Sequence, residues 1–349
     1  MRNLIINILE NKQSMTANIF TIPPAETLSG FSPTRYDNAE TMYRRCGNSG
    51  VLLPKISLGF WHNFGGVDPY ERSREIARYA FDNGITHFDL ANNYGPPYGS
   101  AEQTMGRLID DDFRPYRDEL FIATKAGYDM WPGPYGNWGS RKYLMASIDQ
   151  SLKRMHLDYV DLFYSHRYDP NTPLEETLQA LVDIVRQGKA LYVGISRWPL
   201  EALKVADEYL RDHAVPLLIY QGRINLLDRE PVKEGILDYC NHNGIGFISF
   251  SPLAQGLLTD RYLNGIPQDS RMSKERFLKS DKLTPELLEY ITRLNTIAKQ
   301  RGETLAEMAL AWILHQQGVT SVLVGASSTQ QLAKNLNCVS AKPFDDIEV

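Results

Sequence analysis

Four side chains that can hold or move a proton stand near the ends of three apolar runs in this sequence. Asp89 and Tyr94 belong to the stretch FDLANNYG, Lys125 follows FIAT, and His166 follows YVDLFYS. Gathered in one cavity, they would form a tuned proton donor. A free phenol has a pKa of about 10, and a neighbouring ammonium lowers it by favouring the phenolate. We therefore expect Lys125 to lower the pKa of Tyr94 and Asp89 to keep Lys125 charged and in place.

His166 would complete this set by orienting the phenol or by hydrogen-bonding the substrate oxygen. Such a site protonates an oxygen that is gaining negative charge. Each residue also has an ordinary structural explanation. Lys125 alone is more often a partner in a surface ion pair, His166 a core histidine, and Asp89 a turn or helix cap. Their joint occurrence after successive apolar runs favours a site.

These residues need elements that bring them together, and the chain alternates strand-like with helix-like segments. Helix starts are indicated by capping boxes at Asp68, Ser100, Thr172 and Thr304, each with Glu or Gln three residues later. The strand-like runs are ISLGFW (56–61), THFDL (86–90), LFIAT (120–124), YVDLFYS (159–165), ALYVGIS (190–196), LLIYQ (217–221), GFISFS (246–251) and TSVLVGAS (320–327).

Eight strand-then-helix units match right-handed crossovers between parallel strands. No G-x-G-x-x-G follows any of the runs, so the phosphate-binding motif of the open dinucleotide fold is absent from the sequence. We therefore predict an α/β fold, a (β/α)8 TIM barrel, with chemistry at the C-terminal ends of its strands. MYRRC, the turn GNSG and VLLP predict an N-terminal β-hairpin plug. Residues 1–40 are predicted to be a loose arm and residues 41–349 the barrel.

Composition limits the binding partners and the cellular location that the sequence predicts. The 349 residues carry a formal net charge of -5, from 42 acidic and 37 basic side chains, so nothing predicts nucleic-acid binding. Three distant cysteines predict neither a disulfide framework nor a metal site and suit a reducing compartment. Asn3 and Asn7 interrupt the apolar start, which we interpret as a tail rather than a signal peptide. Without a run of about 18 apolar residues, we predict no membrane span and a cytoplasmic location.

Five separated motifs carry a family resemblance. FDLANNYG, IATKAG, FYSHR, GISRW and FSPLAQGLLT resemble, in the same order, the motifs of the aldo-keto reductases, over about Met42 to Asn337. Within that superfamily the sequence is similar to the branch of the potassium-channel β subunits and the bacterial L-glyceraldehyde 3-phosphate reductases. The segments KAGYDMWPGPYG (125–136) and YLNGIPQDSRM (262–272) are close to the latter. The resemblance implies NADPH-dependent reduction of a small aldehyde, with L-glyceraldehyde 3-phosphate the first choice and methylglyoxal the second.

The resemblance also implies roles for residues. Tyr94 would be the general acid, tuned by Lys125 and Asp89 and oriented by His166. Ser196, Arg197 and Gln221 would hold the nicotinamide carboxamide, and Phe250 would stack on its ring. The remaining cofactor positions, toward the phosphates and the adenosine, would be Ser251, Leu253, Gly256, Arg261, Arg271, Gly325, Ser327, Gln331 and Asn335.

Two positions depart from the family pattern. Lys334 stands where Glu is usual in the adenosine motif, and Phe250 where Trp or Tyr is usual. The substrate pocket would come from the loops, whose aromatic residues suit a small carbonyl compound. The candidate substrate contacts are Trp61, His62, Trp131 and Arg167, and Arg141 is a further candidate anchor for an anionic group.

Other functions stay open at this point. A regulatory module that holds NADPH as a redox signal, like the channel β subunits, is the main alternative to an enzyme. His166 favours the enzyme, because those relatives commonly have Asn at this position. An unrelated barrel with isomerase or lyase chemistry would bind no nicotinamide cofactor. The sequence also leaves open whether the protein is a homo-oligomer.

Overall fold

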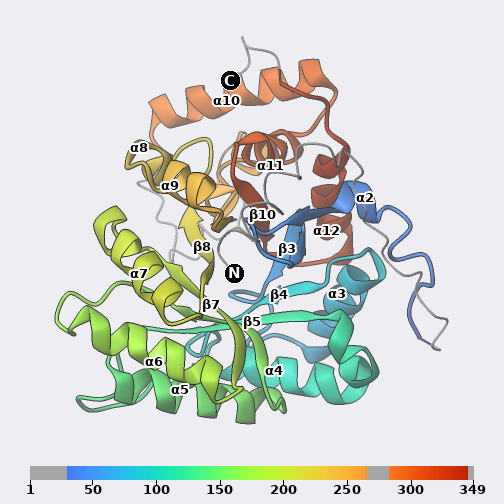
Figure 1. Cartoon of the computed structure of the whole chain (residues 1–349). Helices are drawn as coiled ribbons and strands as arrows, with labels where there is room; N and C mark the ends of the chain where they lie inside the picture. The colour runs from blue at the N-terminus through green and yellow to red at the C-terminus, as the bar shows by residue number, and fades with distance from the viewer. Residues whose placement is uncertain (1–29, 264, 266–282, 345–349) are drawn as a thin grey trace, which may run out of the picture.

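The computed structural model describes residues 30–263, 265 and 283–344. Eight parallel strands close into a barrel in the order β10-β3-β4-β5-β6-β7-β8-β9, and helices surround it (Figure 1). All eight predicted strands are present, so the predicted (β/α)8 TIM barrel is confirmed. The strands are β3 (Ile56–Gly59), β4 (His87–Asp89), β5 (Phe121–Ala126), β6 (Val160–Ser165), β7 (Ala190–Ser196), β8 (Leu217–Arg223), β9 (Gly246–Phe250) and β10 (Val319–Val324).

The helices pack their apolar faces on the outside of the barrel. In the described part of the chain, none of them has the length and apolar character needed to cross a membrane. They are α2 (Ala39–Met42), α3 (Tyr70–Asp82), α4 (Ser100–Leu108), α5 (Arg141–Met155), α6 (Leu174–Arg186), α7 (Leu200–Asp212), α8 (Glu230–Lys233), α9 (Ile236–Asn243), α10 (Pro285–Arg301), α11 (Leu305–His315) and α12 (Thr329–Leu336), with short 3-10 or π segments η2 (Ile109–Phe113), η3 (Arg114–Glu119), η4 (Ala254–Gly256), η5 (Asp260–Tyr262) and η7 (Asn337–Ser340).

Of the four predicted capping boxes, only the one at Thr304 forms. The backbone N–H of Glu307 donates to the Thr304 hydroxyl at 3.2 Å, and the Glu307 carboxylate accepts from the Thr304 backbone N–H at 2.7 Å. At Asp68, Ser100 and Thr172, the predicted helix starts are correct to within two residues, but the predicted N-cap residues are wrong. Those three side chains bond within the preceding loops. The N-cap positions belong instead to Pro69, Gly99 and Pro173.

The predicted hairpin is present and closes one end of the barrel. β1 (Tyr43–Arg45) pairs antiparallel with β2 (Leu52–Pro54). Cys46 and Leu53 are fully buried in the cluster that fills the barrel interior. The backbone N–H of Asn48 donates to the carbonyl of Gly244, just before β9 begins. The hairpin therefore lies at the N-terminal ends of the strands, opposite the end where barrel enzymes place their chemistry.

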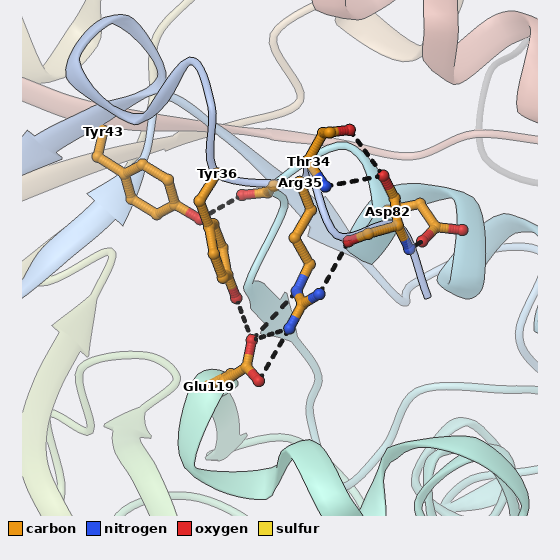
Figure 2. Close-up of polar contacts among 8 residues, drawn as sticks. Thr34, Arg35, Tyr36, Tyr43, Asp82 and Glu119 are labelled. Atoms are coloured by element: carbon orange, nitrogen blue, oxygen red, sulfur yellow. Dashed lines mark hydrogen bonds and ion pairs between the residues drawn. The ribbon is translucent and has the colours of Figure 1, made fainter. Parts of the chain in front are cut away.

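A strap formed by residues 30–42 leads into the hairpin and packs against the side of the barrel. Phe31 is buried against Phe81, with ring centroids 4.9 Å apart. The Arg35 guanidinium donates two hydrogen bonds to one Glu119 oxygen and a third to the other, and the Tyr36 hydroxyl donates to the same carboxylate at 2.7 Å (Figure 2). Of the arm predicted for residues 1–40, residues 1–29 lie outside the described residues, and residues 30–40 are packed on the barrel rather than loose.

We expect Glu119→Gln to destabilise the protein by about 1–3 kcal/mol, because it leaves a buried guanidinium without its counter-charge. The Arg35 side chain is only 1% exposed, whereas that of Glu119 is 33% exposed. The midpoint of urea unfolding measures the effect. Glu289→Gln is the matched control, since its ion pair with Arg293 has a separation of 4.0 Å and side chains about 70% exposed, and such pairs contribute little. Equal midpoints for the two variants would show that the strap contact is energetically neutral.

Candidate active site

Four strands of the barrel deliver four of the predicted residues to one end of it. Asp89 is the last residue of β4, Lys125 lies near the end of β5, and His166 directly follows β6. Gln221 lies near the end of β8. Because parallel strands of a closed barrel end at the same face, these side chains meet above the barrel core.

Lys125 and Asp89 form an ion pair inside the barrel mouth. The Lys125 ammonium lies 2.5 Å from Asp89 Oδ2 and also donates to the Leu90 carbonyl at 2.7 Å. The Gln221 amide donates to the other Asp89 oxygen at 3.2 Å. Lys125 is fully buried and Asp89 almost so. An ammonium buried this deeply needs such partners, since an unpaired buried charge is costly.

Tyr94 stands next to this pair, with its hydroxyl oxygen 3.5 Å from the Lys125 ammonium. The loop after β4 holds it there, because the backbone N–H of Asn92 donates to the Lys125 carbonyl at 2.9 Å. Gly95 permits the tight turn that follows, since a Cβ atom at this position would lie 1.9 Å from the carbonyl oxygen of Pro97. The stretch FDLANNYG thus places the Asp89 carboxylate and the Tyr94 hydroxyl beside the same buried ammonium, that of Lys125.

The pKa of Tyr94 is raised, whereas the sequence analysis expected it to be lowered. Burial raises the pKa of Tyr94 well above its ordinary value, and Asp89 and Tyr128 raise it further. Burial also lowers the pKa of Lys125, against the opposing attraction of Asp89. The desolvation of the phenolate is therefore the largest cause of the shift. Tyr94 stays protonated near neutral pH, which is the state that a proton donor needs.

His166 lies beside the phenol as a neutral imidazole. Its ring is 5.9 Å from the Tyr94 ring and 4.7 Å from the Tyr128 ring, both in edge-to-face contact. Burial lowers the pKa of His166 well below its ordinary value, and the cations Lys125, Arg197 and Arg167 act in the same direction. A neutral imidazole can both donate and accept a hydrogen bond. His166 can therefore contact an uncharged carbonyl oxygen without competing as an acid.

A long cavity of about 810 Å³ extends along the barrel mouth. It is lined by Asp89 and Tyr94 and, farther along, by residues of α12. Among the predicted positions, the cavity is lined by Trp61, His62, Asp89, Tyr94, Gln221, Phe250, Ser251, Leu253, Gly256, Arg261, Gly325, Ser327, Gln331 and Asn335. The structure therefore brings most of the predicted cofactor positions into one space with Asp89 and Tyr94, whereas Lys125 and His166 do not line it.

The far end of the cavity offers polar groups and positive charge. The Gln331 side-chain oxygen accepts from the backbone N–H of Ser327 at 2.8 Å and from its hydroxyl at 3.0 Å. The buried side-chain nitrogen of Asn335 has no hydrogen-bond partner among the described residues. Lys334 and Arg72 also line this end. Arg72 was missed by the sequence analysis, because it lies on helix α3 rather than after a strand and no pattern singles it out.

Several predicted residues do not line this cavity. Ser196 is buried at the end of β7, and Arg197 follows it with an exposed side chain. Trp131 packs on Tyr143, with ring centroids 5.0 Å apart, so it has a structural role in its loop. Arg167 lies beside His166 and stacks on neighbouring aromatic rings. Arg271 lies outside the described residues.

Arg141 does not line the cavity and already has an acidic partner, which argues against it as an anion anchor. It begins helix α5 on the outside of the barrel and pairs with Asp183 at 2.5 Å. The three cysteines, Cys46, Cys240 and Cys338, are free and buried, as small apolar side chains often are. Within the described ranges, no cluster of three or more His, Cys, Asp or Glu side chains is placed to hold a metal ion.

Comparisons with known proteins identify the family of the chain. The family model for the aldo/keto reductase family matches residues 55–349. An L-glyceraldehyde 3-phosphate reductase of Escherichia coli strain K12 is 57% identical over 322 residues, which cover 91% of this chain and 92% of that protein. A probable voltage-gated potassium channel subunit beta of Arabidopsis thaliana is 35% identical over 312 residues, which cover 86% and 92% of the two chains.

A solved structure is similar over most of its length. The crystal structure of a thermostable aldo-keto reductase in complex with the inhibitor epalrestat superimposes with a TM-score of 0.68. The two chains are 30% identical, and the similarity covers 88% of this chain and 96% of the other.

Proposed function

Since this chain belongs to the aldo/keto reductase family, we propose that it uses NADPH to reduce short aldehydes, with L-glyceraldehyde 3-phosphate as the preferred substrate and methylglyoxal as a second. The observation that carries the proposal is the Tyr94 hydroxyl, 3.5 Å from a buried ammonium that is itself paired with Asp89. The similarity to an L-glyceraldehyde 3-phosphate reductase supports the choice of substrate.

The residues along the cavity suit NADPH. Arg72, Arg261 and Lys334 supply positive charge for the phosphates of a dinucleotide. The unpartnered Asn335 nitrogen offers a buried donor to the adenine. A Cβ atom at Gly325 would meet no atom within 4 Å, so the cavity is open at this point.

Near the catalytic candidates, Gln221 and Ser196 would hold the nicotinamide carboxamide and Phe250 would face its ring. When bound, the reduced nicotinamide supplies the hydride. Lys334, which stands where relatives usually have Glu, would change the adenine contact by replacing an acceptor with a cation, and a cation there suits a phosphate on the neighbouring ribose.

Residues of this chain donate the proton and stabilise the charges that result. In the proposed reaction, Tyr94 donates its proton to the carbonyl oxygen as negative charge develops there. Lys125 stabilises the phenolate that remains, and Asp89 keeps the ammonium in place. His166, neutral in its buried position, orients the carbonyl oxygen toward Tyr94. Two donors that are fixed before the reaction stabilise the developing charge at little reorganisation cost.

The protein's three buried, free cysteines also support the proposal that it works in the cytoplasm, where thiols stay reduced. Binding of the cofactor as a redox signal, as proposed for a regulatory subunit, is the alternative that the similarity to a potassium channel subunit beta raises. The catalytic set argues for an enzyme, since His166 and Tyr94 are held together at the mouth.

Steady-state rates with a panel of aldehydes and NADPH test the proposal. We expect kcat/KM for L-glyceraldehyde 3-phosphate to exceed that for unphosphorylated glyceraldehyde at least about tenfold, because binding energy from a remote charged group appears in this constant. NADPH should bind more tightly than NADH in a titration of protein fluorescence. Slow oxidation of NADPH in a single turnover, without cycling on any aldehyde, would favour the regulatory function instead. If no nicotinamide cofactor binds, both proposals fail.

A further inference from the structure

We propose that Arg167 and Arg197 together bind the anionic group of the substrate, a phosphate or a similar anion carried a few bonds from the carbonyl. The inference rests on the proposed function, because it assigns a partner to the charged end of the substrate within the same site. It also gives Arg197 a role toward the substrate, in place of the cofactor role that the sequence resemblance implied.

Tyr128, in the loop after β5, brings the two guanidinium groups together. The central carbon of the Arg167 guanidinium lies 4.3 Å from the centroid of the Tyr128 ring. Arg197 donates to the Tyr128 hydroxyl at 3.0 Å. The same ring meets the ring of His166 edge to face at 4.7 Å, and the Tyr94 ring follows at 5.9 Å from His166. The two cations thus lie one aromatic ring away from the imidazole that would contact the carbonyl oxygen.

Neither arginine forms an ion pair with a carboxylate among the residues that the structure describes. Arg167 donates to the Gly127 carbonyl and to the Asn137 side chain, both at 2.7 Å, and stacks on Trp138. The Arg197 side chain is exposed and contacts the Tyr128 hydroxyl. A guanidinium carries five N–H donors. Each group therefore keeps donors that an incoming anion can use.

The backbone at Arg197 supports a functional role. Its φ of 57° lies in the left-handed region, which costs a residue other than glycine about 1–2 kcal/mol. Strain of this kind collects at binding and catalytic sites, where the surrounding structure enforces it. Here it occurs at the residue directly after the end of β7, at the barrel mouth.

The electrostatics also favour an anion at this place. The charged groups that act on His166 are the cations Lys125, Arg197 and Arg167, and after burial all three lower its pKa. An anion near His166 would therefore face cations. Arginine suits a phosphate because its planar fork can donate two parallel hydrogen bonds.

A phosphate held by the arginine pair would be bound one aromatic ring, that of Tyr128, away from His166. An anchored group that keeps the reacting atoms in position can raise the rate strongly.

The test compares substrate selectivity in Arg197→Gln, Arg167→Gln and the control Arg141→Gln. The measured quantity is the ratio of kcat/KM for L-glyceraldehyde 3-phosphate to that for glyceraldehyde, at saturating NADPH. We expect each of the first two variants to lower this ratio about 10- to 100-fold, the range for losing one charge-assisted hydrogen bond. Arg141→Gln should leave the ratio unchanged, because Arg141 pairs with Asp183 on the outer surface.

Inorganic phosphate gives a second readout. At saturating NADPH it should inhibit glyceraldehyde reduction competitively in the wild-type enzyme and several-fold more weakly in the two variants. Tyr128→Phe should lower the selectivity ratio in the same direction but by less, since it only frees the Arg197 side chain.

Three outcomes would overturn the anchor. One is an unchanged ratio in both arginine variants. Another is a lower NADPH affinity in Arg197→Gln with no change in the selectivity ratio, which would show that Arg197 binds the cofactor. The third is a wild-type enzyme that reduces both aldehydes equally well. This result would contradict the anion anchor but not the proposed reductase activity. A wild-type protein that reduces neither aldehyde contradicts the proposed function itself.

Discussion

Replacing Tyr94 with phenylalanine is expected to lower kcat/KM for aldehyde reduction about 10²- to 10⁴-fold, the range for loss of a general acid. The affinity for NADPH should change little, because the hydroxyl faces Lys125 and not the far end of the cavity. Stopped-flow measurement of NADPH consumption together with a fluorescence titration separates the two effects. A variant that keeps wild-type turnover would show that another group donates the proton.

The pH profile tests the same assignment. Burial raises the pKa of Tyr94, and reduction needs the protonated phenol, so the donor stays competent as the pH rises through the neutral and mildly alkaline range. Burial lowers the pKa of His166, so its protonation should produce no inflection at its ordinary pKa of about 6.5. We expect a flat profile for reduction between about pH 6 and pH 8 on these values. In the reverse direction the phenolate is needed, and alcohol oxidation should therefore rise with pH in the wild type but not in Tyr94→Phe.

Lys125→Met is expected to cause the second large effect, on both activity and stability. It removes the cation beside Tyr94 and leaves Asp89 buried with only the Gln221 amide. Breaking a buried ion pair by removing one partner typically costs about 3–5 kcal/mol. We also expect kcat/KM to fall at least about 100-fold, as when one preorganised electrostatic group is lost.

A double variant separates these two effects. In Asp89→Val/Lys125→Met both charges are absent, and replacing a buried pair with apolar side chains is often neutral or stabilising. The double variant should therefore recover most of the unfolding free energy while remaining inactive. Urea unfolding of the wild type, the two single variants and the double variant gives the coupling energy. If Lys125→Met and the double variant were equally unstable, the pair would not be the source of the loss.

The order of strands and the four catalytic candidates could be predicted because both follow from local patterns. An apolar run followed by polar residues indicates the end of a strand, and in a closed barrel all such ends meet. This reasoning found Asp89, Lys125 and His166 from three separate runs. It also found the hairpin, since the turn GNSG separates two short apolar segments.

Features that depend on contacts between distant segments could not be predicted in this way. Tyr128 and Arg197 are 69 positions apart, and nothing in either segment indicates that they touch. Arg141 looked like a residue of the mouth because it follows the loop after β5, yet the helix it begins turns it toward Asp183. The sign of the pKa shift at Tyr94 depends on burial, and the residue types alone show only the neighbouring charges.

The hairpin at the opposite end of the barrel affects how each catalytic cycle is completed. Cys46 and Leu53 are fully buried there, and Lys125 is fully buried above them, so the described residues close the barrel interior beneath Tyr94. In the proposed reaction the phenol gives up a proton in every turnover and has to recover it before the next. We expect that proton to arrive through the opening that admits the aldehyde, after the alcohol has left. Release of the alcohol and uptake of the proton are then coupled. A solvent deuterium isotope effect on turnover would therefore report alcohol release as well as proton transfer to the carbonyl oxygen.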